Sequence, residues 1–238
     1  MMLRRRAGVA VGMLVVLLFA GAMLFAHSRA KEGPPDRPSL LLLTSLPLLF
    51  GEGFTLDQTG SAALTRLQSR YGVRTIALAD RDSLAGHQLL LLAQPRAQTA
   101  EALVDLDAWV RAGGRVLLLA DPALDWPSER PLGDRLRPPP GFSDTGLLAH
   151  WGVTLSPPSK RGPVVETVGG RQVGFSSPGQ LSSKQCAADG GATIVRCAIG
   201  RGRVTIIADA DLLNADESGA GATANLDFVM AELAAMGR

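Results

Sequence analysis

The sequence lacks the short motifs that mark the common classes of enzymes and nucleotide-binding proteins. It has no Gly-x-Ser-x-Gly motif, no Walker-type loop and no dinucleotide-binding glycine motif, so the usual signatures of serine hydrolases and of nucleotide cofactors are missing. Histidine is also rare, and His27, His87 and His150 stand in no catalytic pattern. We therefore expect no catalytic residues and no cofactor.

Basic residues do not outnumber acidic ones outside the first part of the chain. The formal charge of the whole chain is +2, from 24 Lys and Arg and 22 Asp and Glu. Residues 1–31 hold five of the basic residues and no acidic one, which leaves 19 basic against 22 acidic residues, or −3, in the remainder. A mildly acidic domain without a basic block does not fit nucleic acid as a partner.

A single long hydrophobic run lies near the beginning of the chain. It extends from Ala7 to Ala26 and directly follows Arg4, Arg5 and Arg6. As a helix it would span about 30 Å, the thickness of the hydrocarbon core of a bilayer. The run is longer than the core of a cleavable signal peptide, which has roughly 7–15 residues. We therefore expect residues 1–31 to be an N-terminal transmembrane helix, either an anchor or an uncleaved signal, with cleavage after Ala30 as the alternative.

The distribution of charge around this run predicts its orientation. Three arginines precede it, whereas only Arg29 and Lys31 follow it closely, so the N-terminus is expected in the cytoplasm. The protein would then be a single-pass protein of the bacterial inner membrane. Residues 32–38 read as a proline-rich linker, and residues 39–238 as a periplasmic domain.

The chain has two cysteines, Cys186 and Cys197. A turn signal, Asp189-Gly190-Gly191, lies between them and is followed by a strand-like run. If the two face each other across a hairpin, a disulfide is feasible in an oxidising compartment. The alternative is two unpaired small apolar residues.

The order of apolar runs and helical patterns predicts an α/β fold. Four runs have the length of buried parallel strands, and Val73–Leu78 is a weaker fifth; the four are Leu40–Leu43, Leu89–Ala93, Val116–Ala120 and Val204–Ala208. Helical patterns lie over Ser61–Arg70, between a Thr99 cap and Gly113-Gly114, and over Thr145–Trp151. This alternation is typical of a layered βαβ sheet.

Two other segments complete the predicted domain. Residues 160–203 contain short strand candidates, among them Thr193–Ile199, separated by glycine-rich turns, and predict a small antiparallel extension. A last helix carries Leu226, Val229, Met230 and Leu233 at the spacing of one buried stripe, with Asn225 or Thr223 as its cap.

Polar residues follow the predicted strands where α/β proteins bind ligands, outside the carboxyl ends of the strands. Asp121 follows one strand, and Asp209, Asp211 and Asn214 follow another. Trp126 lies in the irregular, proline-rich segment 121–143, where an aromatic side chain is available for contact with a partner. We take these five residues as candidates for binding a ligand or partner. The spacing matches no calcium-loop pattern, so we assign no metal ligands at this point.

Two stretches together resemble a known family. One is 89–121, with a strand, a proline, a helix, Gly-Gly and a second strand ending in Asp-Pro; the other is 200–236, with a Gly-Arg-Gly-Arg turn, a strand ending in Asp-Ala-Asp and a final helix. This pairing resembles the GldG-like auxiliary proteins of ABC-type transport systems. The resemblance implies a flavodoxin-like layered domain, similar to class I glutamine amidotransferases, that faces the periplasm beside a transporter. The amidotransferase nucleophile would be a cysteine after a core strand, where this chain has Gln94 or Asp121.

These observations lead to two functional hypotheses, with a purely structural envelope protein, which would have no pocket at the strand edge, as a third. The first is a non-catalytic, membrane-anchored periplasmic binding or scaffolding domain, an accessory component whose partner is an ABC transporter permease or another integral membrane protein. The alternative is a metal-assisted hydrolase of the cell envelope, which requires Asp121, Asp209 and Asp211 to converge within about 8 Å, the reach of one shared ion.

Overall fold

The structure is a computed structural model that describes residues 37–50, 60–189, 191–215 and 220–237. The predicted membrane helix and most of the predicted linker, residues 1–36, lie outside the described residues. Pro38–Arg238 form one compact unit. Among the described residues, no helix has both the length and the apolar character needed to cross a bilayer.

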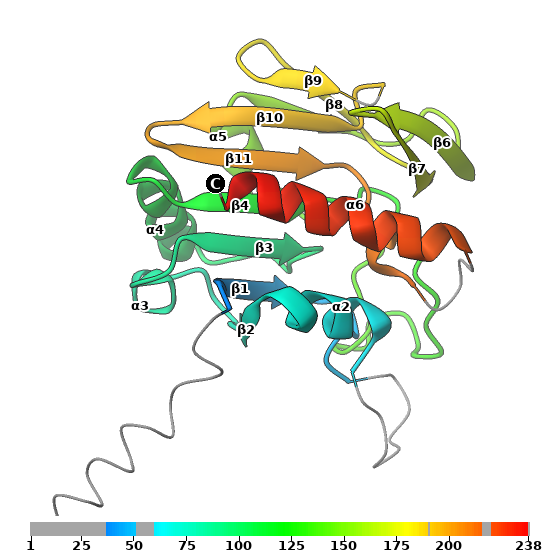
Figure 1. The fold of residues 1–238 in the computed structure, drawn as a ribbon, viewed down its shortest axis with the longest axis horizontal. Helices are drawn as coiled ribbons and strands as arrows, with labels where there is room; N and C mark the ends of the chain where they lie inside the picture. The colour runs from blue at the N-terminus through cyan, green and yellow to red at the C-terminus, as the bar shows by residue number, and fades with distance from the viewer. Residues whose placement is uncertain (1–36, 51–59, 190, 216–219, 238) are drawn as a thin grey trace, which may run out of the picture. The chain divides into compact units, whose positions relative to one another are not determined.

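A seven-stranded sheet runs through the centre of this unit, in the order β2-β1-β3-β4-β11-β10-β9 (Figure 1). Its strands are β1 (Ser39–Thr44), β2 (Gly72–Thr75), β3 (Leu89–Ala93), β4 (Arg115–Leu119), β9 (Ala187–Asp189), β10 (Ile194–Ile199) and β11 (Gly202–Ile207). Strands β2, β1, β3, β4 and β11 are parallel, whereas β10 and β9 continue the sheet in antiparallel pairing. The predicted α/β class is therefore confirmed, and the carboxyl ends of five strands lie at one edge.

The parallel strands are buried on both faces, which explains their continuous apolar sequences. In β1, Leu40 and Leu42 pack into the hydrophobic cluster on one face of the sheet. Leu41 and Leu43 pack into the cluster on the other face. All four side chains are at most 4% exposed, so this strand leaves no room for the polar alternation of a surface strand.

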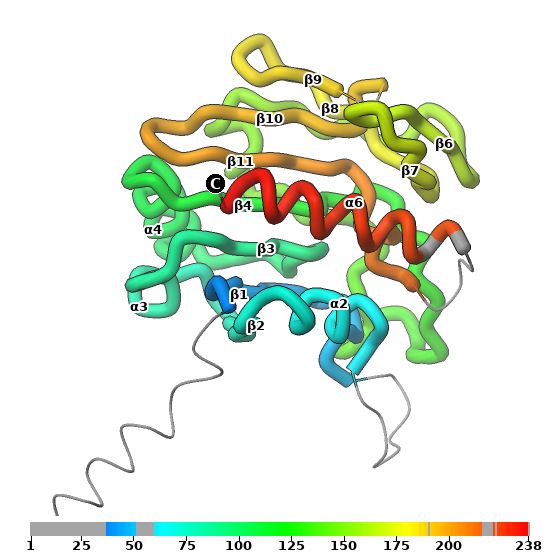
Figure 2. Tube along the Cα trace, viewed as in Figure 1, coloured from blue at the N-terminus to red at the C-terminus, as the bar shows by residue number. Residues whose placement is uncertain are grey.

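Helices cover both faces of the sheet. The cluster on one face includes α2 (Ala62–Arg70) and α6 (Ala220–Met236), and Figure 2 shows α6 over the sheet, running lengthwise along β4 in the opposite direction. The cluster on the other face includes α3 (Arg81–Leu84), α4 (Ala100–Arg111) and α5 (Leu147–His150). Thr99 caps α4 as predicted, since its Oγ1 accepts a hydrogen bond from the Ala102 N–H at 3.2 Å.

The predicted start of the last helix is wrong. Helix α6 already includes Ala220, so Thr223 and Asn225 lie within the helix and do not cap it. The Asn225 side chain instead bonds both backbone groups of Gly174: its Oδ1 accepts from the Gly174 N–H at 3.1 Å, and its Nδ2 donates to the carbonyl at 2.8 Å. Asn225 thus fastens α6 to a strand of the antiparallel region.

That antiparallel region is divided differently from the prediction. Strands β6 (Pro163–Val168) and β7 (Arg171–Ser176) form one two-stranded sheet, and β5 (Val153–Ser156) and β8 (Gln180–Ser183) form another. The segment predicted as Thr193–Ile199 is β10, which extends the central sheet in antiparallel pairing with β11 and β9. The reason is that β10 has apolar side chains for both faces, with Ile194 in one core cluster and Val195 in the other.

The two cysteines face each other across the β9–β10 hairpin. Arg196 pairs with Ala187 in this antiparallel register. The neighbouring residues Cys197 and Cys186 therefore lie opposite each other. The structure joins them in a disulfide, with the two Cα atoms 4.5 Å apart. The bond links the segment before β9 to β10.

Candidate functional site

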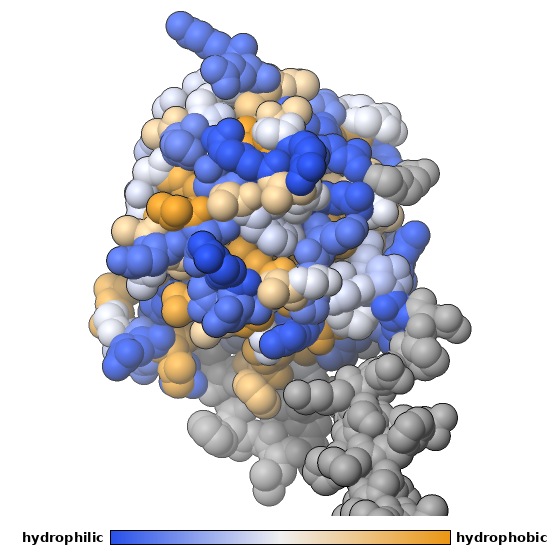
Figure 3. All heavy atoms as spheres, turned by 90° about the vertical axis from the view of Figure 1, so that its left-hand side faces the viewer, coloured by the Kyte–Doolittle hydropathy of each residue, from blue (hydrophilic) through white to orange (hydrophobic). Residues whose placement is uncertain are grey.

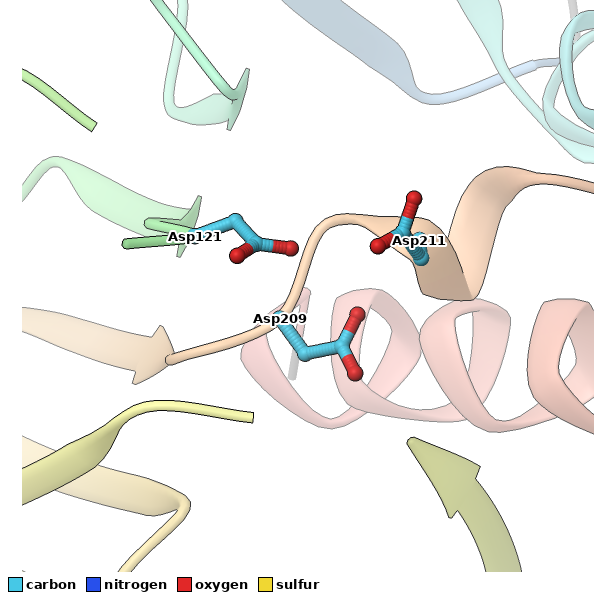
Figure 4. Close-up of side chains that lie close together, drawn as sticks. All are labelled: Asp121, Asp209 and Asp211. Atoms are coloured by element: carbon cyan, nitrogen blue, oxygen red, sulfur yellow. The ribbon is translucent and has the colours of Figure 1, made fainter. Parts of the chain in front are cut away.

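Three aspartates converge at the carboxyl edge of the central sheet. Asp121 follows β4, Asp209 follows β11, and Asp211 begins a short 3₁₀ turn, η1 (Asp211–Leu213). One carboxylate oxygen from each lies within 4.8 Å of the corresponding oxygens of the other two. Figure 4 shows the three side chains grouped around the turn that leads from β11 into η1. The adjacent positions of the parallel strands β4 and β11 in the sheet explain why residues so far apart in sequence meet.

Asp121 is fully buried and held by the main chain. Its Oδ1 accepts a hydrogen bond from the Ala123 N–H at 2.8 Å, and its Oδ2 accepts one from the Ala210 N–H at 3.0 Å. Burial raises the pKa of Asp121 to about 6, the charge of Asp125 raises it as well, and the main-chain hydrogen bonds counteract part of the rise.

Asp209 is also fully buried, but only one of its oxygens has a donor. Oδ2 accepts from the Ser176 N–H at 2.6 Å. Oδ1 is buried and has no hydrogen-bond partner among the described residues. Burial, followed by the charges of Asp121 and Asp211, raises the pKa of Asp209 well above its usual range.

Asp211 connects the turn to the long loop after β4. Its Oδ2 accepts a hydrogen bond from the Asp125 N–H at 2.9 Å. The Asp125 carboxylate in turn accepts from the hydroxyls of Ser176 and Ser177, at 3.0 and 2.7 Å. Asn214 ends η1, where its backbone N–H donates to the Asp211 carbonyl at 2.8 Å.

The two buried aspartates are not matched by cationic side chains. In the described part of the chain, no Lys, Arg or His forms an ion pair with Asp121 or Asp209. Arg161 approaches only the neighbouring Asp125, at 3.9 Å. Buried carboxylates without a counter-charge either take up protons or bind a cation, and these are the two chemical capacities of the cluster.

Gln94 supports the cluster and was not predicted from the sequence. It directly follows β3, is fully buried and adopts the left-handed backbone conformation with a φ of 46°. Its side chain accepts from the Asp121 N–H at 2.9 Å and donates to the carbonyls of Asp121 and Pro139, at 3.0 and 3.3 Å. The available signal was a polar residue between a buried strand and a proline.

The loop between β4 and α5 covers the same edge. Trp126 is half-buried and packs against the core cluster of α2 and α6, so it is less exposed than the sequence predicted. Two other apolar side chains in this loop are exposed, Leu132 by 81% and Leu136 by 64%. Arg96 follows β3, and its Nη2 donates to the carbonyls of Arg135 and Arg137, on either side of Leu136, at 2.7 Å. These bonds fix this part of the loop at the carboxyl edge.

Residues 37–158, about half of the chain, match the sequence profile of a family described as "ABC-type uncharacterized transport system". No curated protein matches the sequence significantly.

Several solved structures share the fold at low sequence identity. The mmIFT52 N-terminal domain is 16% identical with a TM-score of 0.53, and the match covers 83% of this chain and 97% of that one. Cytoplasmic protein STM1381 from Salmonella typhimurium LT2 is 12% identical with a TM-score of 0.52, covering 84% and 99%. The exo-β-1,4-mannosidase Op5Man5 from Opitutaceae bacterium strain TAV5 is 15% identical with a TM-score of 0.50, and the 82% of this chain that matches spans only 36% of the mannosidase.

Proposed function

The chain belongs to the family of ABC-type uncharacterized transport system proteins, and on that premise we propose that it is a membrane-anchored accessory subunit of such a system, with its domain in the periplasm. The family match carries this proposal. The GldG-like resemblance of residues 89–121 and 200–236 points to the same class of protein.

The predicted location is supported by two independent features. The hydrophobic run Ala7–Ala26 has the length of a membrane helix, and the arginines before it favour a cytoplasmic N-terminus. The disulfide between Cys186 and Cys197 is the kind of bond that persists in an oxidising compartment such as the periplasm.

A flavodoxin-like, amidotransferase-like ancestry is part of the proposal, without the amidotransferase chemistry. The order β2-β1-β3-β4-β11 supports this ancestry, because flavodoxin-like sheets have the order 2-1-3-4-5. The residue after β3 is Gln94, whose amide is fully engaged with the main chain. Both cysteines of the chain are in the disulfide. A binding role therefore accounts for the domain better than acyl transfer does.

We assign the partner contact to the loop over the carboxyl edge. Leu132 and Leu136 expose large apolar side chains there, and Trp126 and Asp125 lie in the same loop between β4 and α5. Apolar side chains bordered by polar groups are typical of protein interfaces. At the opposite edge, where the strands begin, hydrophilic and hydrophobic residues are interspersed (Figure 3).

Site-specific photo-crosslinking in cells tests this assignment. A photoreactive amino acid at Leu132 or Leu136 is expected to give an adduct that contains an ABC permease or another integral membrane subunit. The matched control is Arg201, an exposed residue in the turn before β11 at the opposite edge. Adducts of equal yield from Arg201, or none from the two leucines, would contradict the assigned surface.

The second candidate, a metal-assisted hydrolase, is favoured by one observation. The three aspartates meet the condition set from the sequence, because their ligand oxygens lie within 4.8 Å of one another. This hypothesis predicts that the purified chain hydrolyses ester or phosphodiester reporter substrates in the presence of Ca²⁺, Mg²⁺ or Mn²⁺, and that Asp209→Asn abolishes the activity. Hydrolysis that is unaffected by Asp209→Asn, or absent with all three ions, would eliminate it.

A further inference from the structure

We propose that Asp121, Asp209 and Asp211 form a binding site for a hard divalent cation, and that Ca²⁺ is the ion that fits it best. Cation binding requires neither a transporter nor a substrate, so it is independent of the proposed partner surface. The cation test can therefore fail while the accessory role holds, and the accessory role can fail while the cation site holds.

The first observation behind the proposal is the unpartnered oxygen of Asp209. This side chain is fully buried, and its Oδ1 has no hydrogen-bond donor among the described residues. In Figure 4 the Asp209 carboxylate points toward the turn that carries Asp211. A buried acceptor without a partner is costly, and a bound cation at this point would satisfy it.

The second observation is the arrangement of the other hydrogen bonds. The N–H groups of Ala123, Ala210, Ser176 and Asp125 each bond one carboxylate oxygen of the cluster. Each carboxylate oxygen offers two lone pairs, so these bonds orient the side chains and leave acceptor capacity for an ion. The donors come from the β4–α5 loop, the β11–η1 turn and the end of β7. The carboxylates are thus positioned before any ion binds, which lowers the entropic cost of binding.

The third observation is charge. Three carboxylates lie together with Asp125 close by, and no basic side chain of the described residues pairs with Asp121 or Asp209. Oxygen-only donor sets favour Ca²⁺, Mg²⁺ and Mn²⁺ over softer metals. A divalent ion would offset two of the three negative charges of the cluster.

The number of carboxylates favours Ca²⁺ over Mg²⁺. Mg²⁺ usually keeps several waters and binds through one or two carboxylates, whereas Ca²⁺ accepts roughly six to eight oxygen ligands in flexible geometry. Three carboxylates with oxygens within 4.8 Å of one another are close enough to bind one such ion. Such an ion would join the loop after β4 to the turn after β11 and would hold the carboxyl edge in one conformation.

The test is a cation titration of the purified full-length chain in detergent, after treatment with a chelator. Isothermal titration calorimetry and the thermal unfolding midpoint are measured with Ca²⁺, Mg²⁺ and Mn²⁺ separately. The wild-type chain is expected to bind one Ca²⁺, at least tenfold more tightly than Mg²⁺, and to unfold at a higher temperature when Ca²⁺ is bound. Asp209→Asn keeps the acceptor for the Ser176 N–H and is expected to weaken Ca²⁺ binding at least tenfold.

Two further variants keep the result unambiguous. Asp211→Asn changes a side chain that is only partly buried, so it gives a folded ligand variant if Asp209→Asn does not fold. Glu166→Gln is the matched control, because the Glu166 Oε2 is also buried without a hydrogen-bond partner among the described residues but lies on β6, outside the cluster. The control is expected to bind Ca²⁺ as the wild-type chain does. Absence of binding to the wild-type chain at millimolar concentrations, or binding by both aspartate variants equal to that of the wild-type chain, would overturn the proposal.

Discussion

At the scale of single residues, Asp121 couples folding to pH. Its pKa is raised to about 6, chiefly by burial, whereas an unfolded aspartate titrates near 4. Between these two pKa values, Asp121 is deprotonated in the unfolded chain but still protonated in the folded chain. The free energy of unfolding therefore falls as the pH rises. With a chelator present, we expect Asp121 to lower this free energy by about 2 kcal/mol between pH 4 and pH 7.

The measurement is urea unfolding of the full-length chain, followed by tryptophan fluorescence, at several pH values. Asp121→Asn serves as the reference, because the difference between the wild-type and variant slopes isolates this one group from all others. A wild-type slope equal to that of the variant would show that Asp121 titrates normally.

Gln94 is expected to be the main stabilising side chain behind the site. Gln94→Ala leaves the Asp121 N–H without its partner, whereas the Asp121 carbonyl keeps the hydrogen bond from the Phe142 N–H at 2.6 Å. A buried group left unsatisfied costs about 1–3 kcal/mol, so we predict a loss of about 1–3 kcal/mol in unfolding free energy. Gln172→Ala, an exposed position on β7, is the control and should change it by less than about 0.5 kcal/mol. Equal effects of the two substitutions would show that the Gln94 hydrogen bonds contribute little.

The convergence of the three aspartates could be predicted from the sequence, but the groups that support them could not. Asp121 and Asp209 follow buried strands directly, and the carboxyl ends of parallel strands share an edge, so their proximity was predictable. Gln94 and Ser176 contribute through hydrogen bonds that depend on where the β4–α5 loop and the end of β7 fold back. Such long-range backbone contacts leave no periodic pattern in the sequence.

At the scale of secondary-structure elements, the start of β11 lies against the end of α4. A Cβ at Gly202 would be 2.1 Å from the Val110 carbonyl oxygen and 2.3 Å from that of Gly114. Both atoms belong to the main chain, so the contact cannot be relieved by a rotamer change. We expect Gly202→Ala to lower the unfolding free energy by about 3 kcal/mol.

The control is Gly221→Ala in α6, where the added methyl meets open space. This substitution should be neutral or stabilising by up to about 1 kcal/mol. A neutral result at Gly202 would contradict the close packing of β11 on α4.

The hairpin of β9 and β10 depends on the disulfide. Cys186 and Cys197 are separated by 11 residues, and closing a loop of this length stabilises by about 3 kcal/mol in the chain-entropy model. We predict that replacing both cysteines with serine lowers the urea midpoint, and that a reducing agent shifts the wild-type chain toward the variant but leaves the variant unchanged. A variant as stable as the oxidised wild-type chain would show that the bond does not restrain the fold.

Elements with a clear apolar pattern were predictable, and elements set by context were not. The buried strands β1, β3, β4 and β11 are visible as continuous apolar runs. The start of α6 was misplaced because Asn225 is a favourable capping residue that here bonds Gly174 of β7. The short strand β5 was missed because it pairs only with β8, and four residues carry too little pattern to identify a strand.

At the scale of the whole molecule, the family match supports an accessory component of an ABC-type transport system. The seven-stranded sheet collects polar groups at one edge, and a long loop covers that edge and exposes apolar side chains. The sequence predicted this arrangement in outline, since the alternation of strands and helices specifies an α/β sheet. It did not specify how the loop from Asp121 to Gly146 is held, because that segment has neither helical nor strand periodicity.

The accessory role is best tested by purification of the full-length chain, produced at its native level, from membranes in a mild detergent. Mass spectrometry is expected to recover an ABC permease and its ATPase with the chain in near-constant ratio, and substitution of both Leu132 and Leu136 by serine is expected to reduce that ratio severalfold. A chain that is recovered alone, from membranes in which the transporter is present and intact, would contradict the accessory role.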